Sequence, residues 1–190
     1  MYYCRELTKD EIADTYKRYM KKDFPRDELK PLSRILSSLE KDQYICYGIF
    51  SGESLCGYAY LVSLTEEGKK YYLLDYFATV KELRGQGIGS EFLKMLSKEV
   101  CSAEMLLCEA ESINNVSGDE LRIRNRRIAF YLRNGFIDTG VTASVFGVEF
   151  VILELDLGKC HTKEQVREKY ARLYRSFLPE RLYRLFVRIC

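Results

Sequence analysis

A glycine-rich stretch near the middle of the chain has the residue types and spacing of a phosphate-binding turn. It reads Arg84-Gly85-Gln86-Gly87-Ile88-Gly89-Ser90 and follows an aromatic, β-branched segment over 71–80 that predicts a strand. Apolar residues at helical spacing come after it, so the turn should open a helix whose first N–H groups lack partners within the helix. These groups and the helix dipole favour an anion, which glycines let the backbone approach. We therefore expect a cradle for phosphate or pyrophosphate, with Arg84 adding positive charge.

The stretch departs from two common phosphate-binding patterns. No lysine stands where a P-loop requires one, and Ser90 occupies the third glycine position of a dinucleotide-binding fingerprint. It matches instead the pattern Arg/Gln-x-x-Gly-x-Gly/Ala, with Arg84, Gly87 and Gly89 in the defining places. This pattern resembles the acyl-CoA pyrophosphate loop of the GNAT superfamily of N-acetyltransferases.

A second motif lies further along the chain. The segment Phe130-Tyr131-Leu132-Arg133-Asn134-Gly135-Phe136 resembles the later motif of the same superfamily, a helix ending in Phe-Tyr-x-x-x-Gly-Phe. Gly135 fits the stop of that helix. Both motifs occur in the order typical of the superfamily, with a strand-like segment over 105–110 between them, so the chain is identified as similar to GNAT acetyltransferases.

Periodicity predicts the remaining elements. We expect a first strand over 1–7, and a helix opened by a capping box of Thr8 and Glu11. A second helix should begin near Pro31, and a hairpin should join strands over 44–50 and 55–64. Later expectations are a polar turn over 65–70, a helix over 87–102, a loop over 111–119, and closing strands over 136–138 and 147–157 with a connection through 140–146.

This order of elements predicts an α+β fold. The resemblance implies a GNAT-like mixed, mostly antiparallel central sheet flanked by helices, with a C-terminal helical tail. We expect residues 1–158 to form the acetyltransferase domain and residues 159–190 to form an amphipathic basic tail, with one apolar helical face before Pro179 and another after it. Packing on the domain or homodimerisation are the preferred roles of the tail, and contact with a membrane surface or an acidic partner is the alternative.

Composition excludes several classes. The net charge of +2 over 190 residues does not indicate a nucleic-acid partner. We expect no transmembrane segment and no signal peptide, hence a cytoplasmic protein. Seven cysteines lack Cys-x-x-Cys spacing and His161 is the only histidine, so no metal site is expected. Most cysteines should be buried thiols, and the Cys160–His161 pair is interpreted as incidental.

The resemblance implies acetyl transfer from the cosubstrate acetyl-CoA to an amine by direct attack in a ternary complex. In the family, the glycine turn binds the pyrophosphate and the backbone of the preceding strand, here Phe77, Ala78 and Thr79, pairs with the pantetheine arm. Tyr131 matches the tyrosine that protonates the departing thiolate. Asp75 and Glu109 are candidates for the base that an ammonium acceptor requires, and each also fits an ordinary structural carboxylate.

The sequence leaves the acceptor open between a small-molecule amine and an amine of a protein. It also leaves two other functions open. One is a catalytically silent acyl-CoA-binding or interaction module on the same fold, and the other is a nucleotide-binding regulatory domain that uses the glycine turn. Retention of Tyr131 together with candidate carboxylates favours the enzyme.

Overall fold

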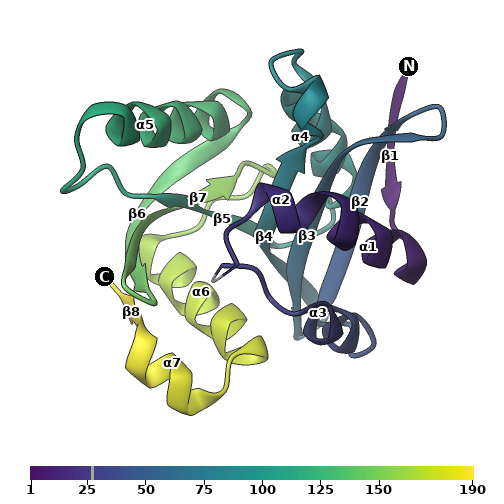
Figure 1. Ribbon diagram of the computed structural model, residues 1–190. Coiled ribbons are helices and arrows are strands. Elements are labelled where there is room, and N and C mark those ends of the chain that lie inside the picture. Colours follow the sequence, from purple (N-terminus) through teal and green to yellow (C-terminus); the bar gives the residue numbers. More distant parts are fainter. Residues whose placement is uncertain (27) are drawn as a thin grey trace. The chain divides into compact units, whose positions relative to one another are not determined.

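The computed structural model describes residues 1–26 and 28–190 of the chain (Figure 1). These residues form two compact units, one of residues 1–63 and 74–101 and the other of residues 64–73 and 102–190. The boundary passes through two long strands, because β3 (Ser54–Glu66) and β4 (Lys69–Thr79) each contribute residues to both units. Each unit is described separately below.

The first unit combines the N-terminal strands with the glycine-rich turn. Its other elements are β1 (Tyr2–Glu6), α1 (Lys9–Thr15), a π-helical turn (Tyr16–Met20), α2 (Lys21–Asp23), α3 (Leu32–Leu39), β2 (Tyr44–Ser51), a 3-10 turn (Lys81–Leu83) and α4 (Ile88–Glu99). β1 pairs antiparallel with β2, and β2 with β3.

Alternating residues of β3 place helices on both faces of this unit. Tyr58 and Tyr60 point to one face, where their hydroxyls donate to Asp23 of α2 at 2.7 Å and to the Ile12 carbonyl of α1 at 3.2 Å. Gly57 points to the other face, where a Cβ would lie 3.4 Å from the ring of Phe92 in α4. The same Cβ would lie 2.9 Å from the Ala78 carbonyl oxygen, so only glycine permits this approach of β3 to β4.

The second unit contains the later strands and the tail. Its elements are β5 (Met105–Glu111), α5 (Gly118–Arg133), β6 (Phe136–Val145), β7 (Val148–Leu155), α6 (Lys163–Phe177), α7 (Glu180–Phe186) and β8 (Val187–Ile189). β7 pairs antiparallel with both β5 and β6, and β8 pairs with the end of β6 (Figure 1). A capping box of Thr162 and Gln165 opens α6, and its buried face consists of Val166, Tyr170, Leu173 and Tyr174.

The structure confirms the predicted fold class. In the described part of the chain, eight strands, mostly antiparallel and flanked by helices, make the mixed α+β architecture that the sequence indicates. The capping box at Thr8 and Glu11 is present, and α3 begins at the residue after Pro31. No helix of the described residues is both long and apolar enough to cross a membrane.

Two predicted connections are wrong because their turns are tighter than expected. The turn over 65–70 consists only of Glu67 and Gly68, with φ of 52° and 74°, and the connection over 140–146 is instead a turn at Phe146 and Gly147, with φ of 48° and 86°. Such two-residue turns with positive φ match the twist of the strands they join. Because Glu67 and Phe146 are not residue types typical of turns, the sequence did not indicate these short turns. The strands on either side are therefore longer than predicted.

Two other expectations are also corrected. The second tail helix does not continue through Ile189, because residues 187–189 form β8 against residues 143–145. The expectation that most cysteines are buried is wrong as well. Only three of the described cysteines are buried, and three others are exposed; the buried ones are Cys46, Cys56 and Cys108.

Candidate functional site

The glycine-rich turn lies between β4 and α4 in the first unit. Gly85 and Gly87 have φ of 80° and 81°, in the left-handed region where a side chain is strained. A Cβ built on either glycine meets no atom within 4 Å, so these residues are needed for their backbone angles and border open space. Residues 84–87 are exposed, whereas Ile88 anchors the helix start in the core.

Backbone donors are available where α4 begins. The Gly87 carbonyl accepts from the N–H groups of Ser90 and Glu91, each at 3.1 Å. Within the described residues, no acceptor is found for the N–H of Ile88 or Gly89. No side chain caps this helix start, and unpaired donors at the positive end of a helix dipole favour an anion. The start of α4 thus offers donors to an anion, and the binding of a pyrophosphate there stays a prediction.

Arg84 has a partner that the sequence did not indicate. Its guanidinium donates to Asp23 at 2.5 Å and to the Thr79 carbonyl at 3.2 Å. Asp23 also accepts from the Tyr58 hydroxyl, whose pKa is raised by burial and by this carboxylate. Arg84 thus ties the turn to α2 and to the end of β4, and half of its side chain remains exposed toward solvent.

The strand that leads into the turn holds the residues expected to bind pantetheine. Phe77, Ala78 and Thr79 are half-buried at the end of β4. The ring of Phe77 packs on that of Phe92 in α4, with centroids 5.4 Å apart. This contact fixes the strand against the helix whose first turn carries the unpaired donors.

Asp75, a candidate base, holds an ammonium group in the structure. Both of its carboxylate oxygens accept from Lys30 Nζ, at 2.5 and 2.6 Å, and one also accepts from the Tyr44 hydroxyl. The Lys30 ammonium lies 5.9 Å from the ring centroid of Tyr44 and 5.6 Å from that of Tyr76. Burial, then the Asp75 charge, raise the pKa of Tyr44 well above its usual value, so this phenol stays protonated.

The second unit places Glu109 against the tail. Tyr174 donates its hydroxyl to Glu109 Oε1 at 2.5 Å, and Tyr170 donates to the same oxygen. Both tyrosines are buried and lie one turn apart on α6. The helix is further tied to β3 by ion pairs of Lys169 and Arg172 with Glu66, at 2.9 and 3.0 Å. The tail is therefore a direct neighbour of a candidate catalytic carboxylate.

Tyr131 lies on α5 beside a buried thiol. Its hydroxyl is hydrogen-bonded to Cys108, and burial raises the pKa of Tyr131 well above its usual value. Burial also raises the pKa of Cys108 to about 12. Consecutive strand residues point to opposite faces, so Cys108 faces α5 and Glu109 faces α6. The structure therefore places Tyr131 and Glu109 on opposite faces of β5.

His161 belongs to a cluster of ionisable side chains in which Glu154 is buried. Its Nδ1 lies 2.5 Å from Glu154 Oε1, and its Nε2 lies 3.8 Å from Glu104, which also pairs with Lys159 and Lys69. Burial raises the pKa of Glu154, and contact with His161 opposes this shift. The histidine is thus a structural partner of β7. No group of metal-binding side chains occurs among the described residues.

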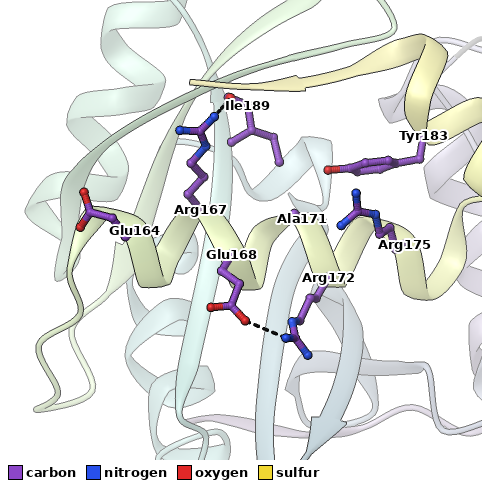
Figure 2. A pocket seen from close by; sticks show the side chains of 8 residues that line it. All are labelled: Glu164, Arg167, Glu168, Ala171, Arg172, Arg175, Tyr183 and Ile189. Atoms are coloured by element: carbon purple, nitrogen blue, oxygen red, sulfur yellow. Dashed lines mark hydrogen bonds and ion pairs between the residues drawn. The ribbon is translucent and has the colours of Figure 1, made fainter.

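A surface pocket of about 590 Å³ lies on the tail and contains none of the predicted site residues (Figure 2). Its three arginines each contact another residue of the tail, and Arg172 also pairs with Glu66 of β3. Arg167 donates to the Ile189 carbonyl at 2.9 Å, Arg172 pairs with Glu168 at 2.8 Å, and Arg175 stacks 4.3 Å from the ring centroid of Tyr183. The contacts of Arg167 and Arg175 join α6 to β8 and α7 respectively, whereas the Arg172–Glu168 pair lies within α6.

Comparison with known proteins identifies the family. The sequence model of the acetyltransferase (GNAT) domain matches residues 42–138, which include the glycine turn, Asp75, Glu109 and Tyr131. The chain belongs to the GNAT acetyltransferase family. A comparison with curated proteins finds no match.

Solved structures share this GNAT fold. A GNAT-family protein from Bacteroides thetaiotaomicron is 18% identical, with a TM-score of 0.70 over 92% of this chain and 97% of that chain. The ribosomal-protein-S18-alanine N-acetyltransferase of Escherichia coli is 16% identical, with a TM-score of 0.60 over 85% and 97%. An acetyltransferase of Bacillus subtilis solved in complex with CoA is 17% identical, with a TM-score of 0.52 over 82% and 99%.

Sequence reasoning missed several residues that contact the predicted site residues or the partners of these. They are Asp23, Lys30, Tyr44, Tyr58, Tyr170 and Tyr174. The tyrosines could have been identified from the sequence by one feature. A buried tyrosine hydroxyl needs a hydrogen-bond partner, so a tyrosine at a core position of a strand or helix indicates a nearby acceptor. Lys30 gave no such signal, because it lies outside any periodic segment.

Proposed function

We propose that this GNAT protein transfers the acetyl group of acetyl-CoA to an amine by direct attack in a ternary complex. The observation that carries the proposal is the start of α4, where two glycines in left-handed conformation border open space beside unpaired N–H groups. This arrangement suits the pyrophosphate of CoA. The family match supports CoA over another pyrophosphate ligand.

The residues of the turn have separate roles in this proposal. The N–H groups of Ile88 and Gly89 bind the pyrophosphate, with Ser90 following in the first turn of the helix. Gly85 and Gly87 shape the turn, Gln86 lies between them at the surface, and Arg84 fixes the turn through Asp23. The backbone of Phe77, Ala78 and Thr79 pairs with the pantetheine arm.

The proposed reaction replaces one acyl bond with another. Acetyl-CoA supplies the acetyl group as a thioester; the nitrogen of a neutral amine bonds to its carbonyl carbon as the carbon–sulfur bond breaks. The amine loses a proton to a base, and the CoA sulfur leaves as a thiolate that takes up a proton from water. An alkylamine has a pKa near 10.4, so only about one molecule in 10³ is neutral at pH 7 and a base is required.

Asp75 and Glu109 remain the candidate bases. Asp75 accepts hydrogen bonds from the ammonium of Lys30, and an ammonium is the species that must be deprotonated. Glu109 accepts hydrogen bonds from the hydroxyls of Tyr170 and Tyr174. Tyr131 is the proposed donor to the CoA sulfur. Because burial raises its pKa, the phenol stays protonated and stabilises the departing thiolate chiefly through a hydrogen bond.

A thiol-release assay tests the proposed function. Purified protein is incubated with acetyl-CoA and panels of small amines, amino acids and peptides with free N-termini, and acetylated products are confirmed by mass spectrometry. We expect amine-dependent thiol release that Gly87→Glu abolishes. Binding of acetyl-CoA without transfer to any amine would favour a silent acyl-CoA module, and equal stabilisation by ATP or NAD would favour a nucleotide-binding domain.

A further inference from the structure

The ammonium of Lys30 lies in a site built by other parts of the first unit. Asp75 contributes a carboxylate that contacts Nζ through both oxygens, and the rings of Tyr44 and Tyr76 lie within 6 Å of it. A carboxylate beside aromatic faces is the usual chemistry for binding an alkylammonium. The ion pair is largely buried, with side-chain exposures of 22% for Lys30 and 14% for Asp75.

The walls of this site are held in place without the Lys30 side chain. Tyr44 and Tyr76 are each only 4% exposed. The Tyr44 hydroxyl donates to Asp75, and the Tyr76 hydroxyl donates to the Glu28 carbonyl at 2.8 Å. Tyr60 packs edge-on against both rings, with centroids 6.4 Å away in each case. The site is therefore preorganised by β2, β3 and β4.

Lys30 itself comes from a different segment, between α2 and α3. Its backbone is anchored, because its N–H donates to the Tyr76 hydroxyl at 2.9 Å and its carbonyl accepts from Tyr16 at 3.0 Å. Its ammonium, in contrast, is at the end of a flexible four-carbon stem. The side chain can therefore leave the site by rotation about its own bonds while the anchored backbone stays in place.

We propose that Asp75, Tyr44 and Tyr76 form the binding site for the acceptor's primary ammonium group, and that Lys30 is an internal occupant that the acceptor displaces. The inference rests on the proposed function, since it assigns the acceptor class: a primary alkylammonium whose charged end is free. Asp75 precedes by two residues the strand segment assigned to the pantetheine arm, so an amine held there lies on the strand that carries the donor.

Internal occupation has a measurable cost for acceptor affinity. When a ligand must displace an internal group, its apparent association constant equals the intrinsic one multiplied by the fraction of molecules in which the site is open. If Lys30 occupies the site nine-tenths of the time, removing its ammonium strengthens acceptor binding about tenfold. A purely structural Lys30 would give no such gain.

The first test measures binding without catalysis. Lys30→Ala removes the propylammonium part of the side chain, so thermal melts are recorded with increasing propylammonium chloride, against sodium chloride at equal ionic strength. We expect saturable stabilisation of Lys30→Ala, and none of Lys30→Ala/Asp75→Asn. Lys22→Ala, which removes an exposed lysine of α2 and keeps Lys30, is the matched control and should need about tenfold more propylammonium for the same stabilisation. An equal response of Lys30→Ala and Lys22→Ala would overturn the ammonium site.

The second test measures displacement with the amine identified by the thiol-release assay. We expect the KM for that amine to fall about tenfold in Lys30→Ala, with the KM for acetyl-CoA unchanged. Lys30→Met, which keeps the apolar stem without the charge, should show the same fall if Lys30→Ala is unstable. An unchanged or raised KM for the amine in a folded variant would overturn the displacement.

The two proposals fail in different ways. Propylammonium binding without any acetylated product would retain the ammonium site and reject the proposed function. Acetylation of an amine with no propylammonium response in Lys30→Ala would retain the proposed function and reject the ammonium site.

Discussion

Tyr131 shows how burial limits what a single residue can do. Its hydroxyl is hydrogen-bonded to Cys108 inside the second unit, and burial raises the pKa of Tyr131 well above the usual value. A thiol has a pKa near 8.5, so complete proton transfer from such a phenol to a thiolate is unfavourable. A hydrogen bond that strengthens as the thiolate forms requires no such transfer, and this is the role that the environment of Tyr131 supports.

Tyr131→Phe should lower kcat by about ten- to a hundredfold, less than the loss of a full general acid, because water can replace part of the hydrogen bond. The Kd for acetyl-CoA and the melting temperature should change little. Steady-state kinetics, calorimetry and a thermal melt measure the three quantities. Tyr183→Phe in α7 is the matched control and should keep full turnover. Unaltered kcat in Tyr131→Phe would remove this residue from the mechanism.

At the scale of single elements, the start of helix α1 makes a pH-dependent contribution to the stability of the fold. At the start of α1, Glu11 completes the capping box by accepting from the Thr8 N–H at 2.9 Å, and it also accepts from Arg5. The hydrogen bond from Arg5 is the main cause that lowers the pKa of Glu11 to about 2 from 4.5. This contribution to stability is complete above the unfolded-state pKa of 4.5 and is lost as the pH falls toward 2.

Glu11→Gln should therefore lower the melting temperature at pH 7 and flatten its dependence on pH between 4.5 and 2. Thermal melts across this range, compared with wild type, measure both effects. Glu53→Gln in the exposed turn between β2 and β3 is the control and should match wild type at pH 7. Parallel pH profiles for Glu11→Gln and wild type would show that the capping box adds no pH-dependent stability.

Two tyrosines of helix α6 in the tail donate hydrogen bonds to the candidate base Glu109. If Glu109 is the base, Tyr170→Phe and Tyr174→Phe each remove one donor and make the carboxylate harder to ionise. We expect the acidic limb of the pH–rate profile to move to higher pH and kcat at neutral pH to change by up to about tenfold, with larger effects in the double variant. A lower melting temperature with an unmoved pH profile would assign the phenols a structural role alone.

At the scale of the whole molecule, residues 159–190 are proposed to be an amphipathic tail attached to an acetyltransferase domain of residues 1–158. The tail buries several apolar side chains in the second unit, including Val166, Tyr170 and Leu173, each at most 1% exposed. Full burial of one such side chain contributes about 1.5–3 kcal/mol, against about 5–15 kcal/mol of net stability in a typical domain. The tail is thus energetically part of the fold.

Truncation after Leu157 should abolish a cooperative thermal transition or cause self-association through the exposed apolar face. Gel filtration and a thermal melt of the truncated chain measure these outcomes. Cys190→Ala is the control, because the Cys190 side chain is exposed and the backbone hydrogen bonds of this residue with Thr142 are kept. An unchanged elution volume and melting temperature after truncation would show that the tail is a dispensable appendage.

Local patterns allowed most elements to be predicted. The capping box at Thr8, the strand–turn–helix order around Gly87 and the helical face of α6 each depend on residues within a few positions of one another. The partners of the candidate carboxylates depend on contacts between distant residues, such as Lys30 with Asp75 and Tyr174 with Glu109. Periodicity does not encode those pairs. The role of β8 escaped prediction for the same reason, because its pairing with β6 decides its conformation.

The most direct test of the account is calorimetric titration of acetyl-CoA into wild type and Gly87→Glu. Gly87 is exposed, borders open space and has φ of 81°, so glutamate adds both a side chain and a negative charge at the proposed pyrophosphate cradle. Gly87→Ala controls for the backbone strain, which costs about 1–2 kcal/mol of stability. The account predicts that Gly87→Glu remains folded and loses acetyl-CoA binding at least tenfold beyond Gly87→Ala. An unchanged Kd in Gly87→Glu would contradict it and place the CoA pyrophosphate elsewhere.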